Sequence, residues 1–488
     1  MKRFLSLFLA IALSASLCAC GKTDDDEQKK SEKSSKKIEH KDSERKSEKK
    51  SKDKDGKITI SVGGWPDPEG DVLDKMNGYK EEFEKENPNI TIVPDTWTFD
   101  LKTFYPKAET GTLPDLIDVY FSEIQNLTSA DYIEDITEAA KEAGFYENIN
   151  PKIRELVSTD GKMYAIPTSA YTFGLHYNVK LFEEAGLMNS DGTPKQPHDW
   201  YELAEMAKTI KETTGKDGFV MPTMNNVGGW IFTNIAWSFG VDFMEERRDG
   251  SWEATFDTPE AVAALQYIKD LKWKYDCIPS NILIDFSGMR ELYATGQAAM
   301  LIDSPNNMVS TIYAMDPDDF GIMALPRGPK RYVALVGGRA YIVAKSKDSD
   351  KKADAALKWI DFKGDGYNID STKAAEMEKN IQDLLNRNGF IGVRDLYVWK
   401  ENSEAVKLKN ELIDKYCNIN PNHVKLYNEF LLDSSVEFQP EESICAQELY
   451  GILDSCIQTV LSDKDADCAE IMNKANKDFQ KNYLDMLN

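Results

Sequence analysis

The chain has 488 residues, of which 41% are hydrophobic and 29% charged, and its formal net charge is −24. This composition is typical of a large soluble globular protein and excludes a membrane bundle. At roughly 100 to 200 residues per domain, the length allows two or three compact units with a substantial core. A small scaffold held together by disulfides is therefore excluded.

The N-terminus has the pattern of a secretory signal peptide. Lys2-Arg3 precedes an apolar run from Phe4 to Leu17, which is shorter than the roughly 20 residues that a helix needs to span a bilayer. The run ends in Leu17-Cys18-Ala19-Cys20-Gly21, and this segment resembles the lipobox of bacterial lipoproteins. The resemblance implies that the chain is exported and that Cys20 is acylated after cleavage.

A charged segment follows over residues 22–57. Of its 36 residues, 31 are Lys, Arg, Asp, Glu or Ser, with 14 basic and 11 acidic residues. Such a segment cannot form a core, and its nearly balanced charge predicts a disordered tether rather than a basic arm that binds nucleic acid. Residues 58–488 then carry a net charge of −29, which disfavours nucleic acid and anionic lipid as partners.

Strands and amphipathic helices alternate from Lys57 onwards, which is the pattern of an α/β protein. The sequence predicts a strand at 58–62, a helix with apolar residues at 73, 76, 79 and 83, and strands at 90–93, 116–121 and 164–167. Further strands are predicted at 298–302, 320–325, 332–336 and 340–344, and the pattern after about residue 350 is almost wholly helical.

Two helices have clear start signals. Asp199 is placed to cap a helix whose apolar face includes Trp200 and Leu203, and Thr258-Pro259-Glu260 opens another. We find no internal repeat and no second linker. Any division into lobes therefore requires the chain to cross between them more than once.

The sequence contains little that indicates an enzyme. It has no GxSxG, HExxH, P-loop or GxGxxG motif, and its four His are scattered. The segment from Asp463 resembles the start of a calcium loop, but Cys468 and Lys474 stand where that loop needs Gly and Glu. We therefore expect no catalytic residue, no metal and no cofactor.

Five cysteines remain beyond the N-terminal Cys18 and Cys20. None has the spacing of a metal site, and the number is odd. Buried or free thiols are favoured, while the disulfide state stays open.

Aromatic and polar residues follow several predicted strands, where ligands of open α/β sheets gather. Flat apolar faces and planar polar groups are what a polyhydroxylated ligand needs. Trp65, beside glycines and a proline, is expected to be exposed, whereas Trp237 is expected in the core. Asp303 and Arg339 are equally compatible with a structural ion pair, and the polar residues at strand ends with helix caps. The candidate ligand-binding residues are Trp65, Asp67, Tyr120, Ser122, Glu123, Tyr171, Asn226, Trp230, Asp303, Asn306 and Arg339.

Several segments, in order, resemble the extracellular solute-binding proteins of ABC importers, in the carbohydrate-binding branch similar to maltose-binding protein. The matching segments are Phe83-Glu84-Lys85-Glu86-Asn87-Pro88-Asn89-Ile90, Gly111-Thr112-Leu113-Pro114-Asp115-Leu116-Ile117, Asp160 to Pro167, His176-Tyr177-Asn178, Leu181 to Leu187, Gly296 to Met300, Leu325 to Pro329 and Gly337-Gly338. One departure is Ser304-Pro305-Asn306-Asn307, where sugar binders often have an aromatic residue. This departure argues against a maltose-like stacked oligosaccharide.

The resemblance implies a two-lobe periplasmic-binding-protein-like fold of class II with ligand held between the lobes. Trp65, Glu123, Tyr120 and Ser122 would contribute from the first lobe and Trp230, Asp303 and Asn306 from the second, with Tyr171 near the crossing and Arg339 beside the glycine step. The expected division is a signal peptide at 1–19, the lipidated Cys20 and tether at 20–57, a first lobe at 58–168 and 316–362, and a second lobe at 169–315 and 363–488.

The resulting hypothesis is a lipid-anchored monomeric receptor on the outer face of the cytoplasmic membrane. It would capture a sugar or oligosaccharide and deliver it to an ABC permease without chemistry. The alternatives are a surface glycan-active enzyme, a peptide-binding receptor of the same fold, and an adhesive lipoprotein.

Overall fold

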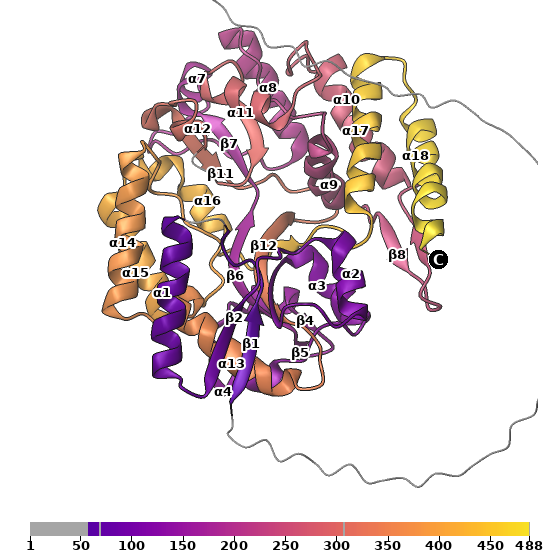
Figure 1. Ribbon diagram of the computed structural model, residues 1–488. Coiled ribbons are helices and arrows are strands. Elements are labelled where there is room, and N and C mark those ends of the chain that lie inside the picture. The colour runs from indigo at the N-terminus through magenta and orange to yellow at the C-terminus, as the bar shows by residue number, and fades with distance from the viewer. Residues whose placement is uncertain (1–56, 68–69, 306–307, 488) are drawn as a thin grey trace, which may run out of the picture. The chain divides into compact units, whose positions relative to one another are not determined.

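The computed structural model describes residues 57–67, 70–305 and 308–487 (Figure 1). The predicted signal peptide, Cys20, the tether and Asn306 lie outside the described residues. Among the helices of the described ranges, none combines the length and the apolar character that a membrane span requires.

A six-stranded mixed sheet forms the first half of the structure. β1 pairs in parallel with β2 and β3, and β12 pairs antiparallel with β3 on one edge and with β6 on the other. β13, from near the C-terminus, pairs in parallel with the start of β12. The strands are β1 (Ile58–Val62), β2 (Ile90–Pro94), β3 (Leu116–Tyr120), β6 (Ala165–Thr172), β12 (Val333–Val343) and β13 (Glu437–Gln439).

β12 is one continuous strand, although the sequence predicts two strands separated by Gly337-Gly338. The two glycines pair with the neighbouring strand and do not break β12. They are glycines because neighbouring groups occupy the space that a side chain would need. A Cβ on Gly337 would be 2.2 Å from Cζ of Tyr171, and one on Gly338 would be 2.3 Å from the carbonyl oxygen of Ser169. The glycines therefore allow close packing within the sheet.

A three-stranded antiparallel sheet forms the centre of the other half. β7 (Gly174–Asn178) lies between β10 (Met300–Asp303) and β11 (Phe320–Met323). The predicted boundary at residue 316 assigned β11 to the first lobe. Its pairing with β7 instead puts this strand in the second sheet, because the chain returns to the first sheet only at β12.

The two helices with predicted start signals begin where the sequence predicts them. Asp199 caps α8 by accepting hydrogen bonds from the backbone N–H groups of Tyr201 and Glu202, each at 2.9 Å, and Thr258 caps α10 in the same way. Around the first sheet lie α1 (Asp71–Glu86), α2 (Leu101–Glu109), α3 (Phe121–Ser129), α4 (Thr137–Glu142), α5 (Phe145–Asn148), α6 (Pro151–Leu156), α13 (Ser349–Ile360) and the hairpin of β4 (Ser158–Thr159) and β5 (Lys162–Met163). The other half contains α7 (Val179–Glu184), α8 (Trp200–Thr214), α9 (Val227–Phe239), α10 (Pro259–Trp273), α11 (Phe286–Ala294), α12 (Met308–Thr311) and the hairpin of β8 (Met244–Glu246) and β9 (Trp252–Ala254).

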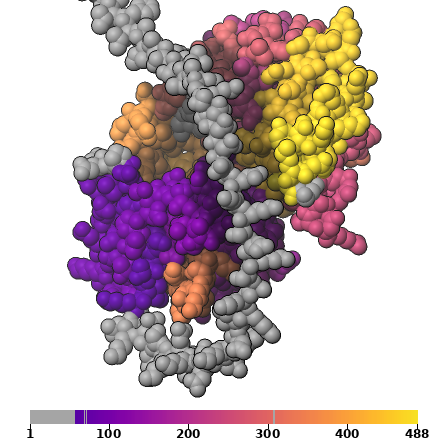
Figure 2. Space-filling model, turned by 45° about the vertical axis from the view of Figure 1, so that its right-hand side comes forward, coloured from indigo at the N-terminus to yellow at the C-terminus, as the bar shows by residue number. Residues whose placement is uncertain are grey.

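The C-terminal part is mainly helical, as predicted, but it is distributed over both halves. α14 contacts α1 through the ion pair of Lys75 and Glu376, whereas α17 packs on α9 and α10 in the upper right of Figure 1. Figure 2 shows α17 and α18 as a yellow block on this side. The elements are α14 (Ser371–Asn386), α15 (Glu404–Tyr416), α16 (Lys425–Phe430), α17 (Ala446–Ser462) and α18 (Cys468–Asn482), with short helical turns at 317–319, 361–365, 421–423 and 484–486.

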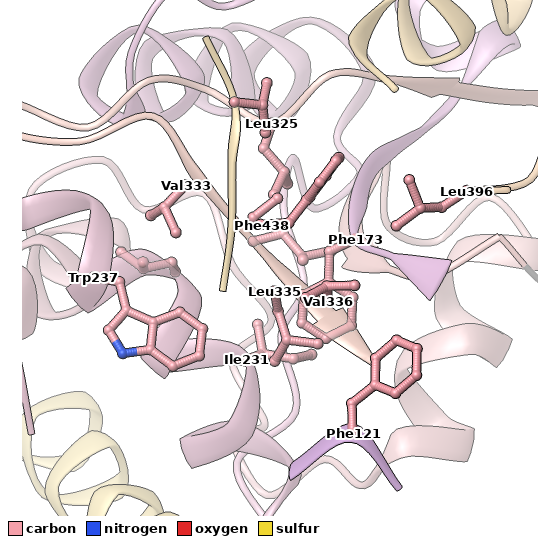
Figure 3. Close-up of a cluster of buried hydrophobic side chains, with 14 of the residues drawn as sticks. Phe121, Phe173, Ile231, Trp237, Leu325, Val333, Leu335, Val336, Leu396 and Phe438 are labelled. Carbon is pink, nitrogen blue, oxygen red and sulfur yellow. The ribbon is translucent and has the colours of Figure 1, made fainter. Parts of the chain in front are cut away.

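Three of the connections between the two halves meet in one region of the core. Phe173 is the single residue between β6 and β7, residues 324–332 join β11 to β12, and residues 440–445 join β13 to α17. Figure 3 shows the apolar side chains of this region, where Phe121, Phe173, Ile231 and Trp237 surround Leu335 and Val336 of β12. All of these side chains are buried, so the crossings share one core.

Candidate ligand-binding site

The end of β3 brings three predicted residues to one place. β3 ends at Tyr120 and α3 begins at Phe121, whose buried ring fixes the turn between strand and helix. Tyr120 is 53% exposed, and Glu123 lies in the first turn of α3. Ser122 Oγ donates a hydrogen bond to Glu123 Oε1 at 3.2 Å.

The strands of the crossing supply a second wall. Tyr171 of β6 pairs in register with Gly337 of β12, and its ring lies directly over that glycine. Burial raises the pKa of Tyr171 to about 12, with the charges of Glu441 and Asp303 acting in the same direction. The phenol therefore stays protonated at neutral pH and is able both to donate and to accept a hydrogen bond.

The third wall comes from the segment between β13 and α17. Glu441 accepts a hydrogen bond from the Tyr450 hydroxyl at Oε2, 3.0 Å away. Gln447, in the first turn of α17, accepts a weak hydrogen bond from Nδ2 of Asn226 at 3.3 Å. Residues from the far C-terminal part therefore face those that follow β3.

These three walls enclose a cavity of about 370 Å³, which lies within the usual range of small-molecule sites. Four of the predicted residues line it together. The lining consists of Tyr120, Phe121, Ser122, Glu123, Tyr171, Val336, Gly337, Gly338, Glu441 and Gln447.

The electrostatics of the cavity are dominated by its two carboxyl groups. Burial raises the pKa of Glu123, and the nearby charge of Glu441 raises it further, while the Ser122 hydroxyl opposes the rise. Burial also raises the pKa of Glu441, opposed by the hydroxyl of Tyr450 and by the indole N–H of Trp230. Glu123 Oε2 is buried without a hydrogen-bond partner.

Trp230 and Asn226 lie next to the cavity without lining it. Trp230 packs edge-on against Phe173 and Phe286, with ring centroids 4.8 and 6.0 Å away. Asn226 precedes α9, and its backbone N–H is bound by the Asp454 carboxylate at 2.7 Å. Both residues therefore support the wall formed by Glu441 and Gln447.

Trp65 is not exposed, and this expectation is wrong. Only 4% of the residue is accessible, because the indole stacks on Trp359 with centroids 6.0 Å apart and its N–H donates to Asn77 Oδ1 at 3.3 Å. The contacts with Trp359 and Asn77 therefore place Trp65 in the core rather than on the surface. Asp67 is exposed and does not line the cavity.

Asp303 and Arg339 form ion pairs with other residues. Asp303 is 1% exposed, and its carboxylate accepts from Nε and Nη2 of Arg290 at 2.7 and 3.1 Å. Arg339 donates to Asp118 Oδ2 at 2.8 Å and lies over the Tyr120 ring, 4.6 Å from its centroid. Arg339 is thus at the rim of the cavity, whereas Asp303 is part of the core.

Sequence reasoning does not identify Glu441 and Gln447 as site residues, nor does it show that the two glycines of β12 line the cavity. Glu441 and Glu442 lie in the part of the sequence that is predicted to be almost wholly helical, where acidic residues are common near helix N-termini. The sequence predicts Gly337-Gly338 only as the break between two strands, and not as part of the cavity wall. Pairing of β13 with β12, which a three-residue strand does not signal, brings Glu441 to the cavity.

A match to a protein-family model identifies the class of protein to which the chain belongs. The family model described as bacterial extracellular solute-binding protein matches residues 69–362, and the chain belongs to this family. It has the two-lobe class II periplasmic-binding-protein fold, as predicted.

Individual relatives are distant. A putative ABC transporter periplasmic-binding protein, YcjN of Escherichia coli K12, is 24% identical over 360 residues, covering 69% of this chain and 75% of the relative. The sn-glycerol-3-phosphate-binding periplasmic protein UgpB of Escherichia coli O1:K1 / APEC is 25% identical over 354 residues, covering 67% and 76%. The structure of maltose-bound T. maritima MalE3 is similar with a TM-score of 0.55 and 22% identity, covering 88% of this chain and 100% of MalE3. At this identity, the structural likeness shows the fold alone.

Proposed function

We propose that this protein is a lipid-anchored receptor that captures a sugar or oligosaccharide between its lobes and delivers it to an ABC permease. Cys20 would carry the lipid on the outer face of the cytoplasmic membrane, and the charged segment 20–57 would give the monomeric binding domain its reach. The relatives named above are binding proteins, which supports a role in capture rather than catalysis.

The position of the cavity is the observation that carries this proposal. Its walls come from the β3–α3 turn of the first sheet, from the strands at the crossing, and from the segment that leads to α17. A solute there would contact both lobes only when they are closed, which gives it the differential affinity that a shift towards the closed state requires. The permease would recognise that closed state.

A thermal-shift screen of the purified chain against mono- and oligosaccharides tests the proposal. A solute at 100 times its Kd should stabilise the chain by about 2.7 kcal/mol. Tyr171→Ala should abolish the shift, because this ring forms one wall of the cavity. Glu442→Gln is a suitable control, since Glu442 binds the Trp237 indole N–H at 3.1 Å and does not line the cavity. A panel without any shift, or normal binding by Tyr171→Ala, contradicts the proposal.

The anchor is tested separately. Cys20→Ser should move the chain from the membrane fraction to the medium without changing the solute affinity. Retention of this variant in the membrane fraction would contradict lipidation at Cys20.

The presence of Glu123 and Glu441 in one cavity favours a glycan-active enzyme as the second candidate. Glycosidases use two carboxyl groups on either side of the scissile bond. Incubation with an oligosaccharide panel decides between the two functions. Sustained release of reducing ends that is lost in both Glu123→Gln and Glu441→Gln supports the enzyme, and unchanged oligosaccharides support the receptor.

A further inference from the structure

The charged side chains that line the cavity are all acidic. Among the described residues that line it, two are acidic, Glu123 and Glu441, and none is Lys, Arg or His. The titratable groups that influence these carboxyls are themselves acidic or phenolic. They are Glu441 and Tyr105 for Glu123, and Glu123, Tyr171 and Tyr450 for Glu441.

The hydrogen-bond partners of the carboxyls inside the protein satisfy only part of their accepting capacity. Glu123 Oε1 accepts from the Ser122 hydroxyl and Glu441 Oε2 from the Tyr450 hydroxyl, and the indole N–H of Trp230 also favours the ionised Glu441. All three groups are neutral donors. Glu123 Oε2 is buried with no partner. A carboxylate has about four acceptor positions, and a buried one that lacks donors is costly. A solute with strong donors would satisfy this acceptor if its binding turned the Glu123 carboxyl towards the cavity that the residue lines.

The positive groups nearest the cavity are already neutralised. Arg339, at the rim, is paired with Asp118. The N-terminus of α9, which would attract an anion, is occupied by Asp454, whose carboxylate accepts from the backbone N–H groups of Asn226 and Gly229 at 2.7 Å each. An anionic solute would meet two carboxyls and no free positive group on this wall.

Two tyrosine rings complete the arrangement. Tyr120 and Tyr171 both line the cavity, and Tyr120 already binds a cation on its ring, namely Arg339. Aromatic faces beside carboxylates are a suitable environment for an ammonium group, since the ring quadrupole and the negative charge attract it together.

We propose that the cavity selects solutes that carry a protonated amine, which binds between Glu123 and Glu441, and that it rejects solutes that carry a phosphate or carboxylate. This inference rests on the proposed function and specifies its solute class. An amino sugar and an aliphatic diamine share the required chemistry. Glu123 lies within the residues that match the family model, whereas Glu441 lies beyond them.

Calorimetry on the purified chain tests the inference with matched solutes. The panel contains glucosamine oligosaccharides, their N-acetylated counterparts, neutral gluco-oligosaccharides, putrescine and glycerol 3-phosphate. The amine-bearing solutes should bind about tenfold or more tightly than the N-acetylated and neutral ones, because hydrogen bonds to charged groups exceed neutral ones by about that factor. The amino sugar and diamine arms distinguish the two sources of the amine.

Proton release provides a second readout. An ammonium group favours the ionised carboxyls and lowers their raised pKa values, so binding should release protons into the buffer. The observed heat should then vary with the ionisation enthalpy of the buffer for amines but not for neutral sugars. The affinity for amines should also rise as the pH rises through the carboxyl pKa values, as long as the amine stays protonated.

Two neighbouring variants localise the effect. Glu441→Gln should lose most of the preference for amines and most of the proton release, whereas Glu442→Gln should keep both. Equal affinity for amine-bearing and neutral sugars would overturn the inference and leave the receptor function standing. Tight binding of glycerol 3-phosphate would overturn the inference as well, and absence of binding by the whole panel would overturn both.

Discussion

The consecutive residues Glu441 and Glu442 have their carboxyl groups in different environments. Glu441 accepts from Tyr450 and lines the cavity, whereas Glu442 Oε1 accepts from the indole N–H of Trp237 in α9 at 3.1 Å. Both residues precede the bend at 443–445 that leads into α17, and their side chains leave this short stretch in different directions. One side of this crossing therefore faces the cavity, and the other is bound to Trp237 of α9.

The first prediction concerns the pH dependence of stability at Glu442. Burial raises the pKa of its carboxyl from 4.5 to about 7. Between these values the folded state binds more protons than the unfolded state, so the free energy of unfolding should fall as the pH rises from about 4.5 to about 7. At 1.36 kcal/mol per pKa unit the loss is at most about 3 kcal/mol. Urea unfolding of the wild type across this range measures it.

Glu442→Gln is the control for this prediction, because the amide keeps the acceptor for Trp237 but cannot ionise. The difference in unfolding free energy between wild type and variant should grow with pH up to about 7 and then level off. A constant difference across the range would show that Glu442 does not carry the effect.

The sequence predicts the order of strands and helices well because local signals determine them. The capping residues Asp199 and Thr258 and the alternation of strands and helices each depend on neighbours in the chain. Trp65 is different, since its burial depends on Trp359, which lies almost 300 residues later in the chain. A tryptophan beside glycines is equally compatible with a surface loop and with a core, and only the tertiary partner decides.

The sequence predicts those residues of the candidate site that come directly after a predicted strand. It does not predict the residue that reaches the cavity from a distant part of the chain. Tyr120, Ser122 and Glu123 share one strand end, and Tyr171 lies on a strand that leads out of the first sheet. Glu441 reaches the same cavity through the short strand β13, which carries no periodic signal. The ion pairs of Asp303 and Arg339 involve residues from other elements, so the alternative of a structural role could not be decided from sequence.

The second prediction concerns Gly337. In Gly337→Val the new Cβ would lie 2.2 Å from Cζ of Tyr171, so the ring has to leave its present place in the cavity wall. The variant should lose about 1–3 kcal/mol of stability, and it should bind the solute more weakly than the wild type. Chemical unfolding and calorimetry measure the two effects.

The double variant Gly337→Val with Tyr171→Ala tests the cause of the clash. It should regain stability relative to Gly337→Val, because removal of the ring relieves the overlap. If the two substitutions destabilise additively, the contact between this ring and this glycine is not responsible.

The third prediction follows from the burial of Trp65. Trp65→Ala should cost about 3–5 kcal/mol, as other large-to-small substitutions of buried aromatic residues do, because it leaves a cavity against Trp359. Solute affinity at a temperature where the variant is folded should be unchanged. A loss of affinity in a variant of normal stability would return Trp65 to the list of ligand contacts.

The last prediction concerns the buried pair of Arg290 and Asp303, whose side chains are 8% and 1% exposed. Asp303→Asn removes the charge that compensates Arg290 in the core, and breaking a buried pair in this way costs about 3–5 kcal/mol. Glu138→Gln provides the comparison, because the Lys141–Glu138 pair at 2.8 Å is largely exposed and should contribute at most about 1 kcal/mol. The loss of unfolding free energy relative to the wild type should therefore be several-fold larger in Asp303→Asn than in Glu138→Gln, while the solute affinity of each variant stays at the wild-type value. Normal stability together with lost binding in Asp303→Asn would instead make Asp303 a ligand contact, as one alternative of the sequence analysis expects.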